Sequence, residues 1–225
     1  MKPSQIPQII LAGLMPWLIT ACTSVRYSAD TLLEEAGYHR EIAILPVEID
    51  YSGPAVSRFS DEDFREIDDR ESRFYQESLY NSLLRKANKN VKVSVQPVER
   101  TNAVLRANKI SIHESWEMDP AELARMLNVD AVVRLHVEES RYLSNAAGFG
   151  LELGRAVVFG PYNGPLPAGP IKTADVRVSC SIFDGDSGSL LWKLGIDQDA
   201  SWNYTPEEII NNLNRRIARK FPYKY

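Results

Sequence analysis

The segment "ADVRVSCSIFDGDSGSLLWKLGI", residues 174–196, decides the fold of this chain. Apolar and polar residues alternate on both sides of its centre, which is typical of strands that bury one face. The centre, Asp184–Gly188, contains two aspartates and two glycines, and these residue types favour tight turns. We therefore predict a β-hairpin over this segment. Its first strand would bury Cys180 as a small apolar residue, in preference to a reactive thiol.

A helix that leads into a strand is predicted just before the hairpin. Asp119 and Pro120 have the residue types of an N-cap and of a first helical position. The run "DAVVRLHVEESRY" at residues 130–142 then predicts a strand. Three of its apolar residues fall on one face because side chains alternate along a strand, namely Val133, Leu135 and Val137.

The amino-terminal half of the chain predicts two more strands and two helices. The apolar run at residues 41–49 contains a proline, which marks the edge or the end of a strand. Valine alternates with polar residues at 91–98, which predicts a second strand. Between these runs, Ser60 and Asp63 resemble a capping box at the start of a helix. Residues 101–107 predict a short helix.

The chain ends in a predicted amphipathic helix. Thr205 is typical of an N-cap, Pro206 of the first helical position, and Glu208 of the reciprocal capping partner. An apolar stripe follows at helical spacing: Ile209, Ile210, Leu213 and Ile217. Taken in order, the elements predict an α/β (α+β) fold. Its mixed β-sheet of about five strands packs against helices and is followed by the C-terminal amphipathic helix.

Composition narrows the classes of function. The chain has 225 residues, of which 44% are hydrophobic, so it can bury one core without metals or disulfides. Its formal net charge is -4, whereas proteins that bind nucleic acid usually carry an excess of Lys and Arg to neutralise the phosphates. We therefore exclude nucleic acid as a partner. With only two cysteines, no disulfide framework is expected.

The amino-terminal segment is typical of a secretory signal peptide. Residues 9–21 form a mostly apolar run after Lys2, and this run is shorter than the about twenty residues that span a bilayer. The sequence Ile19-Thr20-Ala21-Cys22 resembles the bacterial lipobox. The resemblance implies cleavage before Cys22, a covalent diacylglycerol on its thiol and an N-acyl chain on its amine. The alternative is an ordinary signal peptide with an incidental cysteine.

These features give a domain plan. We expect a signal peptide at residues 1–21, a lipidated tether at 22–40, and a single α/β domain at 41–225 with a Gly/Pro-rich insertion at 143–172. The residue after the cysteine is Thr23, where an aspartate would resemble the inner-membrane retention signal of enteric bacteria. We therefore expect a lipid-anchored protein on the periplasmic side of the outer membrane, with the inner membrane as the alternative.

Several short motifs resemble a superfamily of bacterial envelope lipoproteins. They are Leu45-Pro46 after a strand, Asn128–Ala131 between a helix and a strand, and the turn Asp184–Gly188 followed by Leu191-Trp192. The superfamily includes curli-secretion-channel lipoproteins, penicillin-binding-protein activator lipoproteins, the amino-terminal domain of the Tol translocation protein, and neisserial-type surface lipoproteins. The resemblance covers residues 41–193 and implies the fold more than an activity.

No catalytic, cofactor-binding or metal-binding residue is predicted. The histidines are scattered, with His39 in the expected tether, His113 in an expected loop and His136 in a strand, where a core histidine is the favoured interpretation. Asp184 and Asp186 resemble the opening of a calcium loop, but Gly195 stands where that loop needs a glutamate. We also infer no small-molecule substrate.

The insertion at 143–172 has six glycines and four prolines between two strands, and so long a connection tends to be functional or disordered. Its candidate partner-contact residues are Phe149, Leu151, Leu153, Phe159 and Tyr162. The favoured hypothesis is a non-catalytic outer-membrane lipoprotein that binds or scaffolds an envelope assembly or secretion partner. The alternatives are a self-oligomer that forms a secretion channel, and a cell-envelope hydrolase.

Overall fold

The computed structural model describes residues 26–30, 32–35, 37–54, 61–90, 93–142, 172–201 and 203–223. Its elements in chain order are β1 Arg26–Ser28, α1 Leu32–Glu35, β2 Glu41–Ile44, β3 Glu48–Ser52, α2 Asp61–Asn90, β4 Ser94–Val95, α3 Val98–Ala107, α4 Ile112–Glu117, α5 Pro120–Leu127, β5 Ala131–Arg141, β6 Lys172–Asp184, β7 Leu190–Ser201 and α7 Pro206–Lys220. The predicted α+β class is confirmed.

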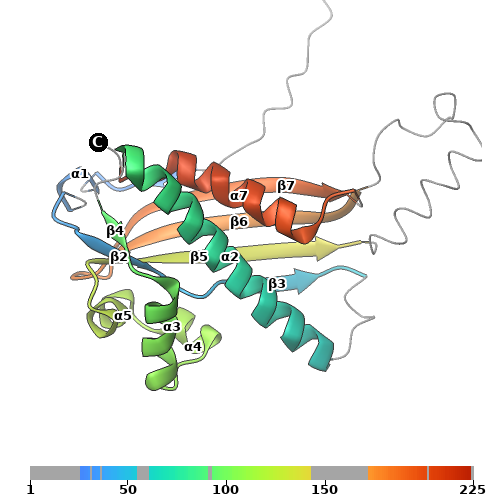
Figure 1. Cartoon of the computed structure of the whole chain (residues 1–225), viewed down its shortest axis with the longest axis horizontal. Coiled ribbons are helices and arrows are strands. Elements are labelled where there is room, and N and C mark those ends of the chain that lie inside the picture. Colours follow the sequence, from blue (N-terminus) through green and yellow to red (C-terminus); the bar gives the residue numbers. More distant parts are fainter. Residues whose placement is uncertain are drawn as a thin grey trace, which may run out of the picture.

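The strands form one mixed sheet in the order β1-β7-β6-β5-β2-β4, and β3 continues the line of β2 beside β5 (Figure 1). β5, β6 and β7 are antiparallel, whereas β2 and β3 run parallel to β5. Within the described residues the sheet has seven strands, whereas about five were expected. One reason is that the run at 41–49 divides into β2 and β3 around Pro46, which has no N–H to donate to the ladder.

The predicted hairpin is confirmed as β6, a turn, and β7. Gly188 adopts a left-handed conformation with φ 70°, which glycine tolerates at little cost. Gly185 lies against the start of β5, where its N–H donates to the Asp130 carbonyl at 2.8 Å. A Cβ at position 185 would lie 2.5 Å from that oxygen, so the close approach requires glycine.

One face of the sheet, here the covered face, packs against α2 and α7, which lie side by side across it (Figure 1). Asn214 of α7 donates to the Tyr75 carbonyl of α2 at 2.9 Å, which fixes the two helices together. The core beneath them contains fully or almost fully buried strand residues: Ile42, Ile44, Val133, Leu135, Val137, Val178, Cys180, Ile182, Trp192, Leu194 and Ile196. Alternation along each strand puts these residues on the same face.

The opposite face of the sheet has a much smaller core. Helices α3 and α5 cover only the part formed by β2 and the start of β5. The buried residues there are Ala43, Leu45, Leu105, Leu123, Ala124, Leu127 and Val132. The predicted N-cap of α5 is confirmed, because Asp119 accepts from the Ala121 N–H. The capping box of α7 is also present, between Thr205 and Glu208.

The described part of the expected tether, residues 26–40, differs from the prediction because it packs on the domain. Arg26–Ser28 forms the edge strand β1, antiparallel to β7, and this adds the second unexpected strand. His39 is buried, with one ring nitrogen 3.0 Å from the Asp184 carboxylate and the other 2.6 Å from the Tyr223 hydroxyl. The sequence pattern of a tether does not reveal these contacts, because the partners of His39 lie far away in the sequence.

Three further boundaries differ from the sequence-based expectations. Of the strand expected at 91–98, the described residues 93–98 contain Ser94–Val95. Helix α3 begins at Val98, before the expected residue 101. The region that holds His113 is helix α4, not a loop, with a capping box between Ser111 and Glu114.

No helix among the described residues is both long enough and apolar enough to span a membrane.

Candidate functional site

The part of the second sheet face that α3 and α5 leave uncovered is the candidate functional site, and we call it the open sheet face. It is a hollow of about 440 Å³. Its floor consists of side chains that alternate with the buried core residues of β5, β6 and β7, and Trp116 of α4 and Tyr27 of β1 stand at its sides. The floor residues that matter for the argument are Arg134, His136, Glu138, Arg177, Phe183 and Lys193.

Arg134 is a buried cation at the inner end of the open sheet face. Its guanidinium lies 5.6 Å from the ring centre of Trp116 and 5.3 Å from that of Phe183, within the range of cation–π attraction. It donates to the Ser115 carbonyl at 2.9 Å and to the Met118 carbonyl at 2.7 Å. Burial lowers the pKa of Arg134 from its ordinary value, and Glu48 opposes this effect. Arg134 therefore attaches α4 to the sheet.

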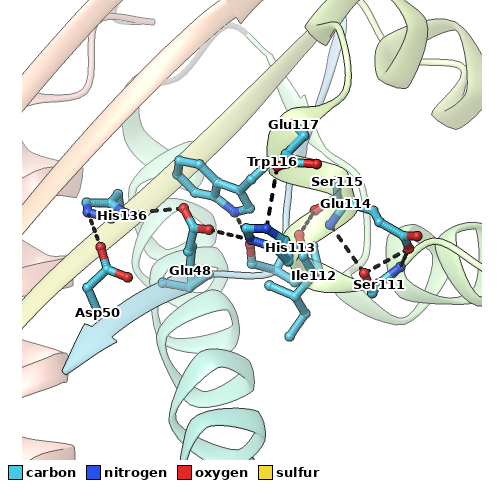
Figure 2. Close-up of polar contacts among 12 residues, drawn as sticks. Glu48, Asp50, Ser111, Ile112, His113, Glu114, Ser115, Trp116, Glu117 and His136 are labelled. Carbon is cyan, nitrogen blue, oxygen red and sulfur yellow. Dashed lines mark hydrogen bonds and ion pairs between the residues drawn. The ribbon is translucent and has the colours of Figure 1, made fainter.

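Two histidines share one carboxylate beside Trp116 (Figure 2). Glu48 of β3 lies 3.2 Å from the His113 ring of α4 and 3.4 Å from the His136 ring of β5. The other ring nitrogen of His136 lies 3.4 Å from Asp50. The favoured interpretation of His136 as a core histidine is therefore wrong. The residue points to the polar face of β5, where parallel pairing places Glu48 beside it.

His136 is not placed to activate a nucleophile such as a serine hydroxyl. Nδ1 of its ring faces Glu48 and Nε2 faces Asp50, so both nitrogens are directed at carboxylates. Ser179 is the residue opposite His136 in the pairing of β5 and β6, yet neither nitrogen is directed at its hydroxyl. Within the described ranges, no group of three or more His, Cys, Asp or Glu side chains could hold a metal ion.

The outer part of the open sheet face carries balanced charge. Arg177 of β6 lies between two carboxylates, 3.1 Å from Glu138 and 2.8 Å from Asp197. These three side chains are mostly exposed, so each pair contributes little to stability. Trp, Tyr and Arg gather here with paired charges around them, and this composition is typical of surfaces that bind other proteins.

A second charged cluster lies at the far end of the sheet and was not predicted from the sequence. Arg141 pairs with Glu139 at 2.7 Å and with Glu71 of α2 at 3.0 Å, and Tyr51 donates to Glu71 at 2.8 Å. Burial raises the pKa of Glu139, although Arg141 acts in the opposite direction. The cluster fastens α2 to the ends of β3 and β5, so we assign it a structural role.

The residues singled out in the sequence do not meet at one site. Cys22 and the candidate contacts Phe149, Leu151, Leu153, Phe159 and Tyr162 lie outside the described residues. Cys180 is fully buried, as predicted, and burial raises the pKa of its thiol. The Asp184 carboxylate has a structural role in the hairpin turn. It accepts a hydrogen bond from the Ser187 N–H at 2.7 Å, and it also contacts the His39 ring.

The chain matches no protein-family model. A search of curated proteins also finds no match. Among solved structures, a PelC dodecamer from Paraburkholderia phytofirmans is 11% identical over 87% of this chain and 93% of that chain, with a TM-score of 0.42. Lipoprotein GNA1162 from Neisseria meningitidis is 12% identical over 80% and 96%, with a TM-score of 0.44.

The LpoB C-terminal domain from Escherichia coli is 8% identical over 76% of this chain and 93% of that chain, with a TM-score of 0.34. The similar structures thus include a neisserial lipoprotein, and neisserial-type lipoproteins are one of the groups that the sequence resembles.

Proposed function

We propose that this chain is a lipoprotein of the bacterial outer membrane, anchored through Cys22 on the periplasmic side, that binds another envelope protein and catalyses no reaction. The lipobox-like sequence before Cys22 supports the anchor. Two or more acyl chains hold a protein stably on a membrane, whereas one chain binds only marginally. The anchor leaves the folded domain free to contact a partner in the same compartment.

The open sheet face is the observation that carries the binding role. In most sheets with one buried face the other face is simply polar, but here Trp116 and Tyr27 stand beside a hollow of about 440 Å³. Trp116 is held in place, because its ring N–H donates to the Pro46 carbonyl at 3.1 Å. An aromatic side chain that is already fixed loses little conformational entropy when a partner covers it.

Charge on the open sheet face favours a protein partner over a uniformly charged one. Arg134, Arg177 and Lys193 alternate there with Glu138 and Asp197. A mixed pattern of this kind offers complementary contacts to a surface that also carries both signs. A polyanion would meet the carboxylates as well as the cations.

The anchor is tested by intact-mass analysis of the protein recovered from its native cells. We expect the mature chain to begin at Cys22 and to carry a diacylglycerol and an N-acyl chain. The Cys22→Ser variant is the matched control, because it lacks the thiol and should lose both the lipid and the membrane fraction. An unmodified wild-type Cys22 would contradict the proposal.

Partner binding is tested by site-specific photo-crosslinking in living cells. A benzoylphenylalanine replaces Lys193 on the open sheet face, and a control carries it at Asn81, which is exposed on α2. We expect a reproducible adduct from position 193 that is absent from position 81. An adduct of twice the chain mass identifies the partner as a second copy. No adduct, or equal adducts at both positions, would overturn the assignment of this face.

A further inference from the structure

The side chains of the open sheet face are arranged in rows, because residues that pair across neighbouring strands point to the same face. The inner row consists of Arg134 on β5, Ser181 on β6, Lys193 on β7 and Tyr27 on β1, each the register partner of the next. Neighbouring strands lie about 4.8 Å apart, so the Cα atoms of Arg134 and Lys193 are about 10 Å apart. The inner row therefore places a serine between two cations and contains no carboxylate.

The outer row has a different charge pattern. It consists of Glu138, Arg177 and Asp197, in which the arginine pairs with both carboxylates. Between the two rows, β6 and β7 carry only the small residues Ser179 and Gly195, which leave the centre of the hollow open. The backbones of the inner and outer rows are about 13 Å apart, because four residues separate them along each strand. The outer carboxylates therefore do not neutralise the inner cations.

Arg134 has hydrogen-bond donors that the fold does not use. Both of its hydrogen bonds, to the carbonyls of Ser115 and Met118, come from Nη2. Its Nε is buried and has no hydrogen-bond partner within the described part of the chain. A guanidinium carries five N–H donors, and a buried donor without a partner is rare in native proteins. Only 7% of Arg134 is exposed, and the residue lines the hollow, so a group bound there could supply the missing acceptor.

The carboxylates nearest to Arg134 are engaged elsewhere. Glu48 and Asp119 act on its charge from a distance and oppose the lowering of its pKa by burial. Glu48 contacts two histidine rings, and Asp119 caps α5. Among the described residues, neither carboxylate forms an ion pair with Arg134, and Lys193 has no ion pair either. The inner row therefore has two positive charges without a contacting negative one.

We propose that the inner row of the open sheet face binds the carboxylate of an aspartate or glutamate side chain of the partner protein, an inference that rests on the proposed binding role of this face. The carboxylate enters the hollow above Ser181 and accepts from Arg134, and Lys193 supplies the second cation. Hydrogen bonds between a guanidinium and a carboxylate are charge-assisted and therefore stronger than those between neutral groups.

The surroundings of the inner row favour a protein side chain over a free acid. Trp116 and Tyr27 stand at the sides of the hollow, where they offer apolar contact to the residues on either side of the bound carboxylate. The carboxylates of the outer row repel a segment that carries many negative charges. The matching partner segment therefore presents a single acidic residue between uncharged ones.

The test observes the Nε–H group of Arg134 directly by NMR. The full-length protein is labelled with ¹⁵N-arginine, purified in detergent, and titrated with a tripeptide that has blocked ends and a central glutamate. The matched probe has a central glutamine and therefore lacks only the charge. The Arg134 signal is identified by its loss in the Arg134→Lys variant.

We expect the glutamate peptide to move the Arg134 Nε–H signal downfield in a saturable manner, because the proton gains a charged acceptor. The glutamine peptide should not move it. Lys193→Gln should weaken binding of the glutamate peptide by about two- to fivefold, the effect of losing an exposed cation. Arg100→Gln, the matched change at an exposed residue of α3, should leave the affinity unchanged.

Two results with the probes would overturn the inference. The first is an equal shift with both peptides, or no shift with either. The second is tighter binding of succinate than of the glutamate peptide, because the hollow would then be a site for a free acid. In cells, the partner segment crosslinked to position 193 should contain an aspartate or glutamate next to the attachment site, and a segment without one would also contradict the inference.

The inference and the proposed function fail on different observations. If position 193 gives its crosslinked adduct but the glutamate peptide leaves the Arg134 signal unchanged, a partner binds this face without an acidic group in the hollow, and only the inference fails. If no adduct forms at position 193, the proposed function fails whatever the peptide does. Benzoylphenylalanine in place of Lys193 weakens the complex only by the same few-fold, which covalent capture tolerates.

Discussion

Leu135 and His136 are neighbours on β5, yet they have opposite surroundings. Leu135 is fully buried in the core beneath α2 and α7, whereas His136 is partly exposed and lies between Glu48 and Asp50. The same division runs along β6 and β7, because side chains alternate between the faces. The covered face carries most of the packing, so the open sheet face is free to change its polar residues without loss of the fold. Stability and the proposed partner binding therefore depend on different residues of the same strands.

The strongest test of this division compares two adjacent residues of β7. Trp192 is fully buried on the covered face, whereas Lys193 is exposed on the open sheet face. We expect Trp192→Ala to lower the free energy of unfolding by about 3–5 kcal/mol, because it removes a large buried side chain and leaves a cavity. Lys193→Ala should change it by less than about 0.5 kcal/mol. Urea denaturation measures both, and equal losses would show that the two faces share the packing.

Arg134 should be an exception to this division between the two faces. It lies on the open sheet face, but it is buried, so its removal should reduce stability. Arg134→Ala would leave the Ser115 and Met118 carbonyls without their donor and remove the contacts with Trp116 and Phe183. We expect a loss of about 2 kcal/mol. Hydrogen exchange should rise in α4 more than in α7. If hydrogen exchange in α4 did not change, contacts other than those of Arg134 would hold this helix on the sheet.

Asp184 tests the end of the sheet where the hairpin turn meets the amino-terminal segment. Burial raises the pKa of this carboxyl, but hydrogen bonds from Ser187 and His39 outweigh that effect, and the net pKa is lowered. The resulting stability is present above the unfolded-state pKa of about 3.9 and is lost as the pH falls through the lower folded-state value. Asp184→Asn should cost about 1–2 kcal/mol at neutral pH.

The difference between wild type and Asp184→Asn should shrink below about pH 4, because the wild-type carboxyl then becomes protonated. Denaturation midpoints across this pH range measure the effect. If the difference in stability between the two proteins stayed constant down to pH 2, the loss in Asp184→Asn would not come from the charge of the carboxylate. Ser189→Ala is the control for local disruption in the same turn, because the Ser189 side chain bonds to Ser187 and its contact with Asp184 is made by the backbone, which the substitution keeps.

A small change in stability is also expected at Arg177. Its two ion pairs, with Glu138 and Asp197, are exposed, so Arg177→Ala should cost at most about 1 kcal/mol. The crosslinked adduct from position 193 should nevertheless weaken, since a charged contact with the partner is lost. A destabilised protein with an unchanged adduct would reverse the roles assigned to the two faces.

The sequence was sufficient wherever the signals were local. The hairpin turn, the helix that begins after Asp119 and the helix that begins after Thr205 all depend on residues within a few positions of one another. The strand β1 could not be predicted, because Arg26–Ser28 has no apolar pattern and takes its structure from β7. The burial of His39 likewise depends on Asp184 and Tyr223, which are remote in the sequence.

Only part of the open sheet face could be predicted from the sequence. Alternation along residues 130–142 assigns Arg134 and His136 to the face opposite Leu135, so their direction could have been derived. What covers that face depends on how far α3, α4 and α5 extend over the sheet, and no local pattern encodes this. The position of Glu48 beside His136 depends in addition on the break around Pro46, which starts β3 opposite that histidine.

The pairing of the first strand with the last sets an order of events for every new copy of the chain. Synthesis proceeds from the amino terminus, so Arg26–Ser28 emerges long before its partner Leu194 exists. Contacts between such distant residues form late and slowly. A chain in the course of synthesis therefore cannot complete its sheet, and its amino-terminal end stays available to whatever machinery handles nascent chains. The sheet can close only once β7 is present to pair with β1.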